Sequence, residues 1–145
     1  MKPQPLAYPE TRYKPAPVAD LSSRKERERL SPAGLKAFFN IQARWNVRDE
    51  DARALLGGVT NGPFYEMKRN PARLLDTDRL TRVSYLIGIF KALNILYSEK
   101  LADSWVQLPN ANPLFAGQTP LAFMIKGGLP AIQIVRRLLD ARRAG

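Results

Sequence analysis

The sequence contains no cysteine and no histidine. Their absence excludes disulfides, thiolate nucleophiles, Cys/His zinc sites and every mechanism in which imidazole acts as the base. Stability must therefore come from packing, and a reducing compartment such as the cytoplasm is allowed. An enzyme with this composition would depend on carboxylate, lysine or tyrosine chemistry. No pair of carboxylates lies outside a helix cap or a charged face, so we expect no catalytic residue, metal, cofactor or small-molecule substrate.

Long apolar runs are also missing. The longest run, residues 83–97, has about 15 residues and contains Lys91, whereas a membrane-spanning helix needs about 20. The N-terminal segment has Lys2 but lacks the apolar stretch of a secretory signal. We therefore expect neither a membrane span nor a secretory signal.

The chain does have a basic balance and enough apolar residues for a core. It carries 23 Lys and Arg against 13 Asp and Glu, a formal net charge of +10, and 45% of its 145 residues are hydrophobic. A positive balance favours partners such as DNA or an acidic protein. The alternative is a basic protein with no nucleic-acid role.

The expected fold is all-α in three parts. Residues 1–30 are rich in proline and basic side chains, which predicts a flexible arm. Residues 31–98 are expected to form a helix-turn-helix domain with a long central helix, and residues 99–145 a small helical C-terminal unit. No alternation of apolar and polar residues long enough for a strand is present.

Helix signals are strong from Ser31 onward. Ser31 as N-cap and Pro32 at the first helical position predict a helix that runs to about Trp45. Asp49 is expected to cap a second helix, and the glycine pair 57–58 to end it, because glycine tolerates the left-handed conformation of a helix terminus.

Five further helical segments are expected. A short helix covers residues 61–69, and a long one begins at residue 76 or 77 and runs to about 98. Residues 101–107 form one or two turns, and two helices follow over 119–127 and 129–142. The long helix is apolar on more than one face, which predicts burial on both sides. One side would meet the first three helices, and the other the C-terminal unit or a second copy of the chain.

A helix-turn-helix pattern lies in residues 54–67. Ala54 is the small residue at the helix crossing, Gly58 lies in the turn, and Val59, Phe64 and Met67 are the apolar positions that follow. The alternative is an ordinary corner between two helices, because such matches also arise by chance in helical proteins.

The base-reading positions of this motif are unusual. Asn61 can bond adenine, but Gly62 and Pro63 carry no group that reads a base, and Glu66 would repel phosphate. Basic side chains nearby can contact the DNA backbone without adding specificity. The candidate DNA-contacting residues are Thr60, Asn61, Lys68, Arg69 and Arg73.

The segment after residue 104 carries fixed residues that a core does not require: Trp105, then P-N, then F-x-G-x-T-P-L and G-G. In one interpretation Trp105 closes the base of the C-terminal unit, and Gly117 with residues 119–120 fixes a tight loop before a helix. In the other, the loop with Leu114 and Phe115 is presented to a partner, because exposed aromatic residues are enriched at interface hot spots.

Arginines are concentrated at the end of the chain, at positions 136, 137, 142 and 143. Positive charge suits the C-terminal end of a helix dipole, which is one explanation. The other is that Arg136, Arg137, Arg142 and Arg143 enter a partner's pocket for phosphate or carboxylate, with which guanidinium pairs in bidentate fashion.

The helix-turn-helix followed by this block resembles the Xre/MbcA/ParS antitoxins over about residues 31–145. The resemblance implies a bacterial cytoplasmic antitoxin whose C-terminal block binds a RES-domain toxin, an enzyme that consumes NAD⁺, and covers its active-site cleft. It also implies a homodimer that binds operator DNA together with the toxin. The residues that match the toxin-binding block are Trp105, Pro109, Asn110, Leu114, Phe115, Gly117, Thr119, Pro120 and Leu121.

Three hypotheses are therefore open. In the first, the C-terminal unit covers the toxin's entrance and the terminal arginines occupy the site of the dinucleotide's pyrophosphate. In the second, the chain is a stand-alone transcriptional repressor whose C-terminal unit only dimerises. In the third, it is an adaptor that differs from an antitoxin only in its partner.

Overall fold

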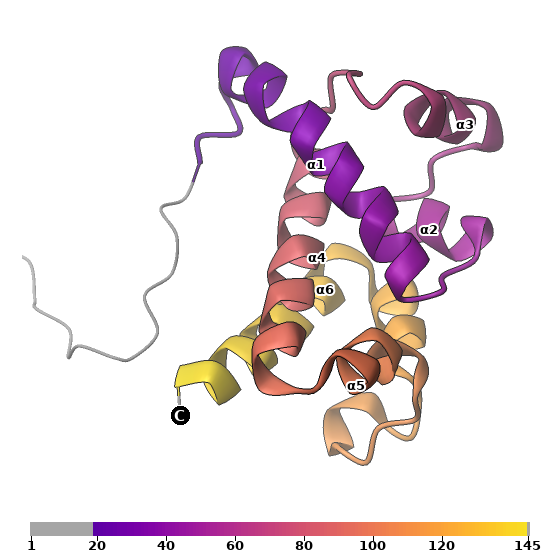
Figure 1. The fold of residues 1–145 in the computed structure, drawn as a ribbon, viewed down its shortest axis with the longest axis vertical. Coiled ribbons are helices and arrows are strands. Elements are labelled where there is room, and N and C mark those ends of the chain that lie inside the picture. The colour runs from indigo at the N-terminus through magenta and orange to yellow at the C-terminus, as the bar shows by residue number, and fades with distance from the viewer. Residues whose placement is uncertain (1–18, 145) are drawn as a thin grey trace, which may run out of the picture.

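The computed structural model describes residues 19–144, and within them the fold is all-α, as expected. No strand occurs in this part of the chain, and none of its helices is long and apolar enough to cross a membrane. The elements, shown in Figure 1, are α1 (Arg24–Arg44), α2 (Asp49–Leu55), α3 (Asn61–Arg69), α4 (Thr77–Leu96), α5 (Glu99–Ser104), the 3-10 helices η1 (Trp105–Gln107) and η2 (Pro113–Phe115), and α6 (Pro120–Ala144).

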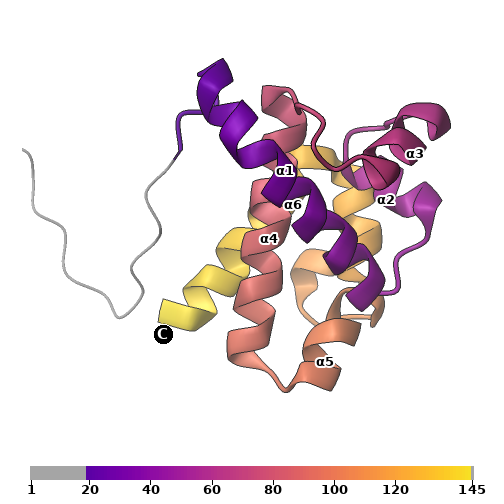
Figure 2. The same cartoon turned by 45° about the horizontal axis from the view of Figure 1, so that its top comes forward.

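Helix α4 is the centre of the fold. Its packing partners are chiefly α6 on one side and α1 on the other, as both views of the ribbon show (Figures 1 and 2). Val83, Leu86 and Ile89 are buried on its inner faces. The expectation that this helix is covered on both sides is confirmed, and the C-terminal unit supplies the second cover. One continuous core therefore joins residues on either side of the boundary that we placed at residue 98.

Helix α1 begins earlier than the sequence suggested. Its N-cap is Ser23, whose hydroxyl accepts a hydrogen bond from the backbone N–H of Glu26 at 3.3 Å. Ser31, which we expected to cap the helix, is fully buried inside it. Its hydroxyl donates to the carbonyl of Arg27 at 2.6 Å and accepts from the N–H of Leu75 at 3.0 Å. Ser31 therefore joins α1 to the segment before α4.

The expected arm of residues 1–30 is only partly described. Residues 1–18 lie outside the described residues. The end of the segment, from Arg24, belongs to α1, so the boundary that we placed at residue 30 falls within a helix.

Helices α2 and α3 follow the expected order. Asp49 is the first residue of α2 and not its cap, which is Arg48. Gly57 and Gly58 end α2 with φ of 91° and 87°, the left-handed region that glycine adopts without strain. Phe64 of α3 is buried, and its ring meets that of Phe39 of α1 edge to face, with the two centroids 5.6 Å apart.

Helix α6 consists of two helices in direct succession, as the sequence indicated. The hydroxyl of Thr119 accepts a hydrogen bond from the N–H of Ala122 at 3.1 Å and so caps the first of them. Gly128 separates the two with non-helical angles, φ 66° and ψ −152°. The second part carries Ile132, Val135 and Leu139 into the core against α4.

An arginine closes the contact between α4 and α6. A Cβ atom placed on Gly88 would lie 1.9 Å from a terminal nitrogen of the Arg136 guanidinium, so this group rests directly on the α4 backbone. Arg136 is held there by a 2.9 Å bond from its Nε to Asp140 and by the ring of Tyr85, 5.9 Å away. Glycine at position 88 is therefore required by the close approach of a side chain from α6.

We expect Gly88→Ala to displace Arg136 from α4. The guanidinium would lose its bond to Asp140 and its contact with Tyr85, at a cost of about 1–2 kcal/mol in the free energy of unfolding. Urea denaturation of Gly88→Ala, Arg136→Ala and the double variant measures the coupling. Most of the cost of Gly88→Ala should vanish when Arg136 is already alanine. Additive costs would contradict this account.

Candidate functional site

The loop between η1 and α6 is held by its own side chains. The Asn110 carboxamide oxygen accepts from the N–H of Asn112 at 2.9 Å, and the Asn112 carboxamide oxygen from the N–H of Leu114 at 3.0 Å. Ala116 and Gly117 then take positive φ values of 48° and 81°. The two asparagines thus act as turn formers, which explains their place beside prolines.

Phe115 points inward from this loop. Its ring lies edge to face with Trp105, at 6.0 Å between centroids, and with Phe123 of α6, at 5.3 Å. Phe115 is 1% exposed and Trp105 is also buried. The expected presentation of Phe115 to a partner was therefore wrong, because Phe123 completes an aromatic cluster that the motif alone did not reveal.

The remaining residues of the expected toxin-binding block divide by exposure. Pro120 and Leu121 are buried at the start of α6, so with Trp105 and Phe115 they support the loop from inside. The accessible residues of the block are Pro109, Asn110, Leu114, Gly117 and Thr119, of which Asn110, Leu114 and Thr119 are half-buried.

Polar contacts join the C-terminal unit to the end of α1. The Gln107 amide nitrogen donates to the carbonyls of Trp45 and Asn46, at 3.3 and 3.1 Å. The Arg44 guanidinium bonds Asp103 at 2.9 Å and Glu99 at 3.1 Å. The hydrogen bond with Asp103 raises the pKa of Arg44 above its ordinary value. These contacts position the C-terminal unit against the N-terminal helices.

An open groove lies where this unit meets α2, with the start of α6 as its other wall. Its lining mixes charged, amide and apolar side chains, which suits a polar peptide surface better than a small apolar ligand. The lining residues are Arg48, Asp51, Gln107, Gln118, Thr119, Leu121, Ala122, Ile125 and Lys126. Among them, only Thr119 and Leu121 belong to the expected set.

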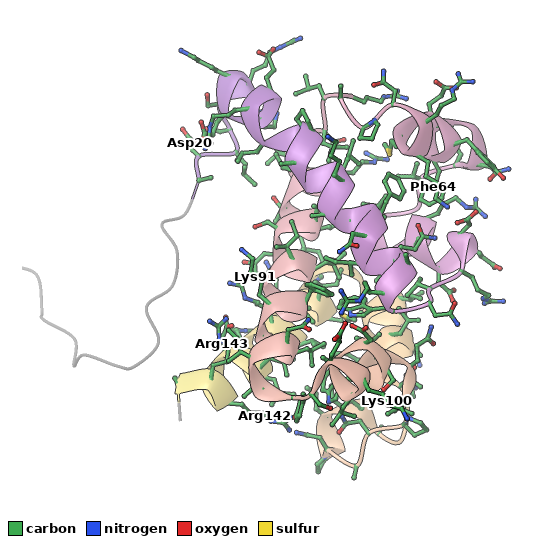
Figure 3. The ribbon with its side chains drawn as sticks, viewed as in Figure 1. Asp20, Phe64, Lys91, Lys100, Arg142 and Arg143 are labelled. Carbon is green, nitrogen blue, oxygen red and sulfur yellow. The ribbon has the colours of Figure 1, made fainter. Side chains whose placement is uncertain are left out.

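The four terminal arginines differ in their surroundings. Arg136 and Arg143 both turn toward Asp140, with nitrogen–oxygen distances of 2.9 and 3.9 Å. Arg142 is exposed and donates to the Tyr97 hydroxyl at 3.0 Å. Arg137 is exposed on the outer face of α6. Figure 3 shows Arg142 and Arg143 at the end of α6, beside the lower half of α4. Arg137 and Arg142 are therefore the best placed to meet a partner.

The expected DNA-contacting residues also differ from one another. Thr60, Asn61 and Arg73 are exposed. Arg69 is paired with Glu66 at 2.8 Å. Lys68 bonds Asp49 of α2 at 2.7 Å, and its ammonium lies 5.2 Å from the centre of the Phe64 ring.

Lys68 is thus part of the contact between α2 and α3. Its hydrogen bond lowers the pKa of the Asp49 carboxyl, with a second contribution from Gln42. Because this pKa is lowered, the contact contributes its full stability at pH values above the ordinary pKa of aspartate. The contribution weakens as the pH falls through the lowered pKa.

Exposed apolar side chains were missed by the sequence analysis. Tyr65 of α3 is 59% exposed and Ile95 of α4 is 63% exposed. In the C-terminal unit, Leu101 and Leu108 are exposed too. The signal for Ile95 was available, since Ile87, Lys91 and Ile95 repeat every fourth residue on one side of α4.

Comparison with known proteins assigns the C-terminal third of the chain to a known domain family. Residues 92–145 match the family described as antitoxin Xre/MbcA/ParS C-terminal toxin-binding domain. The chain is also 37% identical over 130 residues to a protein of Sinorhizobium fredii (strain NBRC 101917 / NGR234) named "Uncharacterized protein y4oB", covering 89% of this chain and 98% of that one. No solved structure matches the chain significantly. The chain belongs to the family of this relative and carries an antitoxin toxin-binding domain, which places it on the antitoxin side of a toxin–antitoxin pair.

We expect Phe115→Ala to destabilise the fold by about 3–5 kcal/mol, because truncating a buried aromatic residue leaves a cavity. The emission of Trp105, its ring partner, should shift to longer wavelength. Leu108→Ala, on an exposed side chain of the same loop region, should cost less than about 1 kcal/mol. Thermal unfolding with fluorescence detection measures both. Equal, small losses would mean that Phe115 does not anchor the loop.

Proposed function

We propose that this chain neutralises a RES-domain toxin that consumes NAD⁺ by covering the toxin's active-site cleft, and that it does no chemistry itself. The single observation that carries the proposal is the toxin-binding domain at residues 92–145. The RES identity comes from the resemblance of about residues 31–145, from the helix-turn-helix pattern to the C-terminal block. The protein would act in the bacterial cytoplasm, where its toxin is made.

The exposed arginines support an electrostatic part in this inhibition. Arg137 and Arg142 extend from the outer surface of the last helix. We expect acidic side chains around the entrance of the toxin's cleft, and these would pair with guanidinium groups. Guanidinium groups of the antitoxin would exclude the dinucleotide by occupying this entrance. The buried aromatic cluster around Phe115 would keep the loop rigid for the same contact.

The first experiment is a pull-down of the tagged full chain from its host, with partners identified by mass spectrometry. Recovery of a stoichiometric RES-domain protein whose NAD⁺ consumption the chain inhibits would support the proposal. Recovery of promoter DNA with no protein partner would leave the stand-alone repressor. Deletion of the last helix is not a suitable control, because Ile132, Val135 and Leu139 fill the core against α4.

We expect the double variant Arg137→Glu and Arg142→Glu to inhibit the RES-domain protein at least about 10-fold less strongly, as loss of interface arginines commonly costs more than 1 kcal/mol. The measurement is NAD⁺ consumption at increasing antitoxin concentration. The control is Arg24→Glu with Lys25→Glu at the start of α1, where both side chains are exposed. Unchanged inhibition by the α6 variant would refute the electrostatic part.

We further propose that α3 contacts operator DNA and that the chain acts as a homodimer on a two-fold operator. Asn61, Tyr65 and Arg69 repeat every fourth residue along the exposed side of α3, so they share one face. Asn61 is suited to adenine, and Arg73 in the following loop to a backbone phosphate.

We expect Arg73→Ala to lower the slope of log K against log salt for promoter DNA by about 0.9, the value for one phosphate contact. Asn61→Ala should instead reduce the preference for the promoter over unrelated duplex and leave the slope unchanged. Fluorescence anisotropy over a salt series measures both. Lys100→Ala on α5 serves as the control. A full chain with no affinity for promoter DNA would end this part of the proposal and leave the toxin-binding part intact.

A further inference from the structure

An exposed stripe runs along α4 beside its contact with α6. Ile87, Lys91 and Ile95 are four residues apart and therefore lie on one side of the helix. Ile87 is half-buried, Lys91 is exposed and Ile95 is 63% exposed. Gly88 lies seven residues before Ile95, about two turns away on nearly the same face, and there the Arg136 guanidinium covers α4. At Ile95 the helix surface is open.

The end of α6 lies beside the end of α4, close in the chain to Ile95. Arg142 donates to the hydroxyl of Tyr97, which places its guanidinium beside the end of α4. In Figure 3, Lys91, Arg143 and Arg142 are all labelled along the side of the molecule where α4 and α6 meet. We call Ile87, Lys91, Ile95, Tyr97 and Arg142 the seam surface. It combines an exposed aliphatic side chain with basic groups from two helices.

The charge of this region is mainly positive. The sequence has no acidic residue between Asp78 and Glu99, so α4 contributes only positive charge to the seam surface. On the neighbouring part of α6 the acidic residue is Asp140, which bonds Arg136 and lies near Arg143. An apolar centre with a basic rim is complementary to an acidic protein surface with an apolar depression.

We propose that the seam surface is where the toxin docks, with Ile95 as the apolar anchor and Lys91 and Arg142 as its basic rim. This inference rests on the proposed function and adds the surface that would carry it. Tyr97, Ile95 and Arg142 lie within residues 92–145, the segment that matches the toxin-binding domain, and Lys91 directly precedes it.

The occupant is an acidic partner and not a second copy of this chain. Pairing of two seam surfaces about a two-fold axis would bring Lys91 and Arg142 of one copy near the same groups of the other, and such like-charge contacts are unfavourable. The antitoxin's net charge of +10 likewise favours an acidic partner at this surface.

Site-specific photocrosslinking tests the contact in the intact chain. A photoreactive phenylalanine analogue replaces Ile95 in one variant and Tyr65 in the other. The two side chains are similarly exposed, but Ile95 belongs to the seam surface and Tyr65 to the exposed face of α3. Each variant is mixed with the purified RES-domain protein of the same host and irradiated. We expect a crosslink to the RES-domain protein from position 95 and none from position 65. A position-95 crosslink to a second copy of the chain would overturn the proposal.

Affinity provides the second measurement. We expect Ile95→Asp and Lys91→Glu each to raise the Kd for the RES-domain protein by about 10-fold or more, as hot-spot losses do. Tyr65→Asp and Lys36→Glu, matched in exposure and charge change, should stay within about 2-fold. Circular dichroism melting checks that all four variants fold.

The outcomes distinguish a failure of the proposed function from a failure of the docking surface alone. If the unaltered chain does not bind the RES-domain protein at all, the proposed function fails, and the seam surface as its docking site fails with it. If the unaltered chain binds and the Ile95 and Lys91 variants bind equally well, the proposed function stands and the seam surface is wrong.

Discussion

The burial of α4 on both sides is the constraint on which the rest of the structure depends. Helix α1 packs on one side and α6 on the other, so neither the N-terminal helices nor the C-terminal unit closes its core without it. The segment that matches the toxin-binding domain begins at Ala92, inside this helix. The domain is therefore a functional segment built on a shared core, and its surface is positioned by helices that lie outside it.

Local signals predicted the elements well, whereas contacts between distant segments decided what the sequence analysis missed. Asp76 caps α4 and Gly57 ends α2, because each acts on its own backbone neighbours. Ser31 carries the same type of cap signal, but its hydroxyl serves a contact with Leu75, 44 residues away. Phe115 stands in an exposed-looking loop, and its burial depends on Phe123 in the following helix. The residues next to Ser31 and Phe115 in the sequence do not show which partners the fold gives these side chains.

The same limit explains the candidate site. The arginine cluster was visible in the sequence, but the different roles of its members were not. Arg136 rests on Gly88 as part of the α4–α6 contact, while Arg142 reaches the surface beside Tyr97. A loss of inhibition after substitution of Arg136 could therefore result from a disturbed contact between α4 and α6 as well as from a lost contact with the partner. Arg137 and Arg142 give the cleaner measure, because their guanidinium groups are exposed.

Charge and apolar area have separate parts in the proposed complex. Basic groups such as Lys91 and Arg142 accelerate the encounter with an acidic partner and orient it, so reversing their charge raises the Kd mainly through the association rate. A long-lived complex needs an apolar group that is desolvated on binding, and Ile95 is 63% exposed in the described part of the chain. Substitution of the rim should therefore act mainly on the association rate and its salt dependence, whereas substitution of Ile95 should act on dissociation. An inhibitor that must hold a toxin at low concentration depends on the second of these quantities.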